Sequence, residues 1–183
     1  MLDAAEYLHL AIDASQKGDH HAALSYLNQA LDHEPANARL IYFQAAEYAE
    51  LGLFERACIG MSKALELDDS IDIARFQLGL LCLQLQRPDD ARETFSTLAS
   101  LTCDDSLRIF AEAYIHLLDD NLAGAKTKLE AGLINCQNPA LKADMARILA
   151  SVTEEASQPT IAQPTDNTTT VFLGAYRDAP ERV

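Results

Sequence analysis

The sequence predicts an all-α protein in which antiparallel helical hairpins stack in series as an α-solenoid. Two observations carry this prediction: the composition suits helices, and small and large apolar residues recur at a constant spacing. Of the 183 residues 49% are hydrophobic, only 7 are Gly and 6 are Pro, and Trp is absent. An all-β chain would need many more turn-forming residues.

The recurrence has a period of 34 residues and continues through four units. One set of small residues comprises Ala11, Ala45, Gly79 and Ala113. A second set of small residues comprises Ala23, Ala57, Ala91 and Ala125. A third set is large and apolar and comprises Leu27, Met61, Phe95 and Leu129. Small residues let two helices approach closely where they cross, and the large residue fills the next interhelical gap.

The period divides residues 1–156 into four hairpins and a final helix. The hairpins are expected at about 4–37, 38–71, 72–105 and 106–139. Pro88 stands where the second helix of the third hairpin should begin, and Asn138 with Pro139 marks another helix start. From there apolar residues at helical spacing predict a helix over about 139–153, namely Leu141, Met145, Ile148, Leu149 and Val152. We expect this helix to cap the open end of the fourth hairpin.

These segments resemble the tetratricopeptide repeat family, whose repeat length is also 34 residues. Residues 18–35, GDHHAALSYLNQALDHEP, are similar to the second helix and closing turn of that repeat. Residues 51–57 and 61–68 match nearly as well, whereas the fourth unit has Gly132 where Ala or Leu is usual. The resemblance covers about residues 4–139 and implies a superhelix that serves as a general binding scaffold.

The resemblance also implies a concave groove lined by the first helix of each hairpin. The family's groove positions correspond here to Leu8, Ile12, Arg39, Tyr42, Ile73, Phe76, Leu80, Leu83, Phe110 and Tyr114. Such a groove is apolar and aromatic, and large exposed apolar patches usually mark interaction surfaces. The alternative is that superhelical packing buries part of this set. Arg39 is its only basic member, so a clamp for the C-terminal carboxylate of heat-shock chaperones is not expected.

A different composition begins at Ser157. Residues 157–170 are rich in Ser, Gln, Pro, Thr and Asn, which predicts a flexible linker. An apolar segment follows at residues 171–176, VFLGAY. We expect Val171, Phe172, Leu173 and Tyr176 to dock in the groove of the same chain or of a neighbouring copy, which would allow self-association. The alternative is a disordered segment that contacts nothing.

Charge and hydropathy exclude several classes of partner. The net charge of −14 repels nucleic-acid and lipid phosphates, and no run of Lys or Arg counters it locally. The longest apolar runs fall far short of the roughly 20 residues of a membrane span. The first residues lack the features of a signal peptide, so we expect a cytoplasmic protein. Its four cysteines form no C-x-x-C pair and are expected to be free thiols.

No enzymatic or cofactor motif stands out. There is no phosphate-binding loop, nucleophile elbow or zinc-binding helix signature. His20 and His21 fall in an interhelical turn without a ligand partner at metal spacing, and His116 takes a core position. We therefore expect no enzyme, no cofactor and no metal site.

The sequence thus predicts an interaction scaffold, adaptor or chaperone that binds an apolar peptide or helix in its groove. One alternative is a structural subunit that assembles through the ends of the solenoid or the C-terminal segment. A narrower alternative is a bacterial secretion chaperone with tetratricopeptide repeats.

Overall fold

The computed structural model describes residues 2–155, and the regular structure in this range is entirely helical. The nine helices found there are α1 (Ala4–Gln16), α2 (His20–His33), α3 (Ala38–Glu50), α4 (Phe54–Leu67), α5 (Asp72–Gln84), α6 (Pro88–Leu101), α7 (Asp105–Leu118), α8 (Leu122–Asn135) and α9 (Pro139–Glu155). The prediction of an all-α solenoid is confirmed. The expected linker and the docking residues Val171, Phe172, Leu173 and Tyr176 lie outside the described residues.

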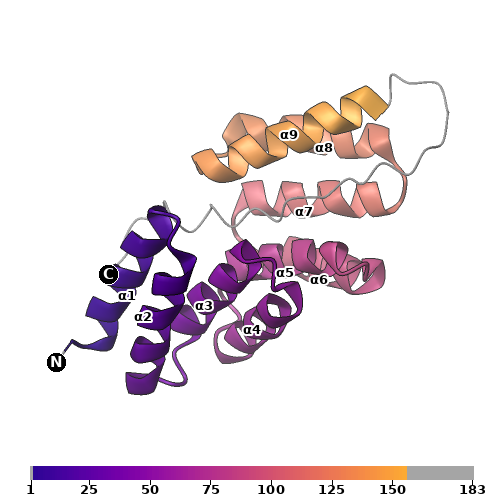
Figure 1. Cartoon of the computed structure of the whole chain (residues 1–183). Helices are drawn as coiled ribbons and strands as arrows, with labels where there is room; N and C mark the ends of the chain where they lie inside the picture. The colour runs from indigo at the N-terminus through magenta and orange to yellow at the C-terminus, as the bar shows by residue number, and fades with distance from the viewer. Residues whose placement is uncertain (1, 156–183) are drawn as a thin grey trace.

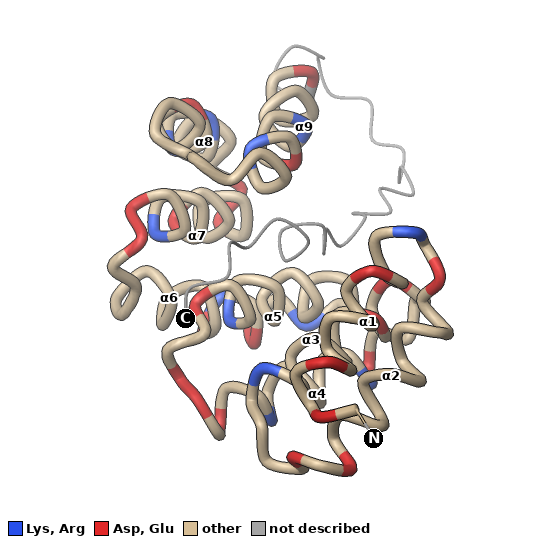
Figure 2. Tube along the Cα trace, turned by 90° about the vertical axis from the view of Figure 1, so that its left-hand side faces the viewer, with Lys and Arg blue, Asp and Glu red and all other residues tan. Residues whose placement is uncertain are grey.

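Successive helices pair as hairpins, and the hairpins stack into a curved row (Figure 1). The odd-numbered helices lie toward the inner side of the curve and the even-numbered helices toward the outer side (Figure 2). Helix α9 packs on α8 and continues the row beyond the fourth hairpin. We call the side formed by α1, α3, α5 and α7 the inner face.

The residues of the 34-residue period form the core of the row. The alanines of the second small set and the residues of the large set are at most 1% exposed. Ala11, Ala45 and Ala113 of the first small set are similarly buried. The periodic positions therefore lie where helices cross, as their sizes indicate.

The turn inside each hairpin repeats the same backbone geometry. Its central residue has a positive φ: 77° at Gly18, 74° at Gly52, 56° at Gln86 and 53° at Asp120. The amide after each of these residues donates to a carbonyl five residues earlier, for example Asp19 to Ala14 at 2.9 Å and Arg87 to Cys82 at 2.8 Å. This is the Schellman arrangement, which ends a helix with one left-handed residue. The first two hairpins place glycine there, whereas the other two do not.

Gly132, the departure from the repeat pattern, has a packing reason. A Cβ atom at this position would lie 2.4 Å from Cε1 of Phe110, so the glycine makes room for that ring. Gly79 does the same for Phe95, whose Cε1 would lie 2.5 Å from an added Cβ. In both hairpins a glycine on one helix receives an aromatic ring from the other helix.

Candidate functional site

Half of the predicted groove residues are accessible on the inner face. Arg39 is exposed, and Leu8, Ile12, Ile73 and Leu83 are half-buried. These residues come from α1, α3 and α5, so the accessible part lies toward the N-terminal end of the row.

The expectation that the other half is exposed is wrong. Tyr42, Phe76, Leu80, Phe110 and Tyr114 are each no more than 4% exposed. Phe76 and Tyr114 pack between hairpins: Phe76 lies edge-on to Tyr114 at 5.8 Å, and Tyr114 stacks on Phe95 at 4.9 Å between ring centroids. Burial raises the pKa of Tyr114, and the carboxylate of Asp144 on α9 adds to this effect. Phe76 and Tyr114 thus hold the third and fourth hairpins together instead of facing solvent, whereas Phe110 packs against Gly132 within the fourth hairpin.

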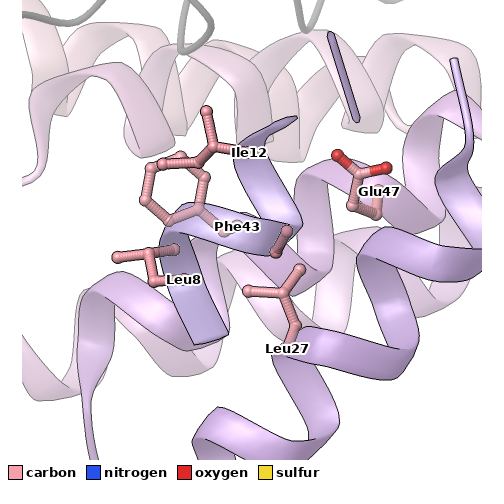
Figure 3. A pocket seen from close by; sticks show the side chains of 6 residues that line it. Leu8, Ile12, Leu27, Phe43 and Glu47 are labelled. Carbon is pink, nitrogen blue, oxygen red and sulfur yellow. The ribbon is translucent and has the colours of Figure 1, made fainter. Parts of the chain in front are cut away.

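A small pocket opens at the N-terminal end of the inner face. It is shallow, since its volume of about 140 Å³ includes space open to solvent, and its lining residues are Leu8, Ala11, Ile12, Leu27, Phe43 and Glu47. Helices α1, α2 and α3 supply them, and Figure 3 shows the side chains of Leu8, Ile12 and Phe43 gathered on one side. We call this site the α1–α3 pocket. Its wall is apolar except for one carboxylate.

That carboxylate is held in place by a histidine of another helix. The Glu47 side chain is 1% exposed, and its Oε2 atom lies 2.8 Å from Nδ1 of His20. His20 begins α2 and Glu47 lies in α3, so the contact joins the first two hairpins. The sequence predicts only that His20 has no partner at metal-ligand spacing, and the structure gives it a carboxylate partner that is distant in sequence. Because the two residues are 27 positions apart, no local spacing pattern could reveal the pair.

Sequence reasoning missed two lining residues, Phe43 and Glu47. They are four residues apart and share one face of α3 with Arg39, which precedes Phe43 by four. The Arg39 guanidinium lies 5.6 Å from the centroid of the Phe43 ring. This spacing was the available signal, but the family's consensus positions assign Tyr42 to the groove instead. Tyr42 is in fact buried, and this burial raises its pKa.

Acidic residues gather at the end of α3 beside the pocket, while Arg39 lies over the Phe43 ring and His20 pairs with Glu47. Neither α1 nor α3 carries a basic residue in its last turn, whereas α3 ends with Glu47 and Glu50. The carbonyl end of a helix has a partial negative charge that attracts cations. Figure 2 shows acidic positions spread over the helices with fewer basic ones among them.

Two cysteines that are distant in sequence meet between the second and third hairpins. The Cys58 thiol of α4 and the Cys82 thiol of α5 interact by a hydrogen bond that lowers the pKa of Cys58 to about 7. Burial of Cys58 opposes this shift, and the positive charge of Arg87 supports it. All four cysteines are free thiols.

Residues 2–155 show neither a metal-binding cluster nor a membrane-spanning helix. No group of three His, Cys, Asp or Glu side chains in that range is arranged to hold a metal ion. No helix there combines the length and the apolar composition that crossing a membrane requires.

Comparisons with known proteins identify the fold. Neither a protein-family model nor a curated protein matches the sequence. Among solved structures, MamA 41-end from Desulfovibrio magneticus superposes with a TM-score of 0.61 at 18% identity, over 86% of this chain and 97% of that one. A tetratricopeptide repeat protein from Parabacteroides merdae gives 0.63 at 19% identity, over 86% of this chain and 66% of that one.

A third similar structure is TTC0263, a thermophilic tetratricopeptide repeat protein of Thermus thermophilus. It superposes with a TM-score of 0.52 at 17% identity, over 82% of this chain and 99% of that one. The chain therefore has the tetratricopeptide repeat fold, and the resemblance seen in the sequence is confirmed at the level of fold.

Proposed function

We propose that this protein is a non-enzymatic interaction scaffold that binds an apolar segment of a partner protein on its inner face. The α1–α3 pocket carries the proposal, because it combines accessible apolar side chains with a fixed carboxylate. Leu8 and Ile12 are half-buried, so they offer apolar surface that a ligand could cover. Contacts with a few anchoring side chains supply much of the energy in peptide recognition.

The partner chemistry follows from the pocket. The α1–α3 pocket is a shallow depression: its volume of about 140 Å³ includes space open to solvent, and no part of it is deep enough to enclose a water molecule. It therefore suits an apolar side chain that lies across Leu8 and Ile12, not one that is inserted between the helices. The carbonyl end of α3, where Glu50 lies, favours a basic residue beside that side chain.

An array of short synthetic peptides tests this proposal on the full-length chain. We expect peptides with an apolar anchor followed by Arg or Lys to bind, and the same peptides with Asp in place of the basic residue to bind less. Ile12→Ser should weaken binding of the selected peptides at least tenfold by fluorescence anisotropy. Leu10→Ser is the matched control, because Leu10 is an exposed residue of the same helix that does not line the pocket. Equal affinities for both variants would contradict the proposal.

Assembly of several copies is a second candidate function. Large apolar side chains are exposed on the outer helices, with Ile59 of α4 at 70% and Ile134 of α8 at 79%. Such residues could contribute to an interface between subunits, or the ends of the solenoid and the 171–176 segment could do so. Light scattering at several concentrations tests this candidate, because an assembly subunit gains mass with concentration and a monomeric adaptor does not.

A chaperone role, including that of a bacterial secretion chaperone, is a narrower form of the first proposal. Shielding of an apolar segment would use the same pocket. We also propose a cytoplasmic location, which four free thiols support because reducing compartments keep cysteines unpaired.

A further inference from the structure

The segment that follows α9 has the chemistry that the α1–α3 pocket favours. After Glu155 the sequence continues for 28 residues, and residues 171–176 are VFLGAY. Arg177 comes next and is the first basic residue after α9. The apolar side chains of this segment match Leu8 and Ile12 of the pocket. Arg177, which Asp178 follows, carries a charge opposite to that of the acidic end of α3.

The length of the intervening chain permits an intramolecular contact. Fifteen residues, 156–170, separate Glu155 from Val171. Helix α9 packs on α8 at one end of the row, and the pocket lies at the other end, between α1 and α3. Fifteen residues span at most about 50 Å, and a linker of polar composition has a mean span of roughly 20 Å. Curvature of the row shortens the path between its two ends (Figure 2).

We propose that the 171–176 segment docks in the α1–α3 pocket of its own chain and competes there with outside ligands. This inference rests on the proposed function, because it names one ligand of the same site. Docking within one chain benefits from a high effective concentration, so a weak contact is enough to limit access for a partner. The protein would then bind its partner only when the partner displaces this segment.

The experiment uses full-length variants and a fluorescent peptide with the sequence of residues 168–179. Wild-type protein should bind this peptide weakly, because its own segment occupies the pocket. Leu173→Asp should raise the affinity for the peptide by roughly tenfold, since the competing segment is weakened. Ile161→Asp is the matched control in the linker and should leave the affinity at the wild-type level. Adding Ile12→Ser to Leu173→Asp should remove the gain.

Three results would overturn the inference. The first is that Leu173→Asp binds the peptide no better than the wild type does. The second is that Ile161→Asp raises the affinity as much as Leu173→Asp does. The third is a wild-type dimer in light scattering that Leu173→Asp converts to monomer, because docking would then occur between two copies. A wild-type mass that stays monomeric as concentration rises supports docking within one chain.

The same variants separate this inference from the proposed function. The array of foreign peptides is applied to the Leu173→Asp protein with and without Ile12→Ser. If foreign peptides bind in a manner that depends on Ile12 while the 168–179 peptide does not, the inference fails and the proposed function stands. If no peptide binds, both fail.

Discussion

In two of the four turns inside the hairpins, the residue with a positive φ is not glycine. The turn residue has a positive φ in every hairpin, but only Gly18 and Gly52 adopt this conformation without steric conflict at Cβ. Gln86 and Asp120 adopt it with a side chain present. Asp tolerates the left-handed region better than Gln does, because its short polar side chain can bond to the local backbone.

Gln86→Gly is therefore expected to stabilise the protein. Relief of the left-handed strain should raise the free energy of unfolding by about 1 kcal/mol, and Asp120→Gly should give a smaller gain. Gln84→Gly is the matched control two residues earlier, where a helical residue is replaced and a loss of about 1 kcal/mol is expected. Urea denaturation measures all three variants, and a destabilised Gln86→Gly protein would contradict the turn geometry.

Cys58 should be an unusually reactive thiol for a partly buried residue. The hydrogen bond with Cys82 lowers the pKa of Cys58 to about 7, and the pKa of Cys82 rises in return. Only the thiolate is alkylated, so the rate of iodoacetamide labelling at Cys58 should reach half its maximum near pH 7. Peptide mass spectrometry follows the reaction. Cys82→Ala should move this midpoint upward, and an unchanged midpoint would show that the hydrogen bond does not control the thiol.

At the scale of helices, a glycine and an aromatic ring form a matched pair in the fourth hairpin. Ala is a better helix former than Gly by about 1 kcal/mol, so propensity alone predicts that Gly132→Ala stabilises α8. The contact of 2.4 Å between an added Cβ and Phe110 predicts the opposite. Overpacking of a core costs about 1–3 kcal/mol, so a net loss is expected.

A double variant checks this explanation for Gly132. Phe110→Leu removes the ring that an alanine at 132 would meet, so Gly132→Ala should be less harmful in that background than in the wild type. Thermal unfolding followed by circular dichroism gives the four stabilities of the cycle. If the two changes in stability simply add, the side chains at positions 132 and 110 do not contact each other, and the explanation is wrong.

Asp144 of α9 makes the stability of the protein depend on pH. Burial raises the pKa of this carboxyl from 3.8 to about 6, although the Arg147 guanidinium opposes the shift. The folded state thus binds the proton more tightly than the unfolded state does. The contribution of Asp144 to the free energy of unfolding is therefore largest below pH 3.8. It is lost as the pH rises from 3.8 to about 6, because the buried carboxyl must then give up its proton.

Asp144→Asn should therefore stabilise the protein at neutral pH. The expected gain is about 1–3 kcal/mol at pH 7, and it should shrink toward zero near pH 4. Urea denaturation at a series of pH values measures the difference between variant and wild type. A difference that does not change between these pH values would contradict the assigned pKa.

At the scale of the whole molecule, the sequence predicts the fold well because the fold is periodic. Ala57 and Met61 repeat in every unit, and each unit can bury its apolar faces only against its neighbours. The accessible surface is harder to predict, because it depends on how neighbouring hairpins rotate against one another. Phe76 and Tyr114 match groove positions of the family, yet they close the interface between the third and fourth hairpins.

The lining of the α1–α3 pocket could likewise be predicted only in part from the sequence. Leu8 and Ile12 were predicted from the repeat register, whereas Phe43 and Glu47 were not. The pocket is formed by three helices from two hairpins, so it depends on contacts between hairpins that the 34-residue period does not specify. The contact of His20 with Glu47 is one of these, because the two residues hold different positions in their repeats.

Hydrogen–deuterium exchange of the full-length protein, with and without an array-selected peptide, shows whether the inner face at α1 and α3 holds an apolar segment of a partner protein. Bound peptide should slow exchange in α1 and α3, with little change in α4, α6 and α8. Slower exchange confined to the outer helices, around Ile59 and Ile134, would contradict this prediction and place the interaction surface on the opposite side of the molecule.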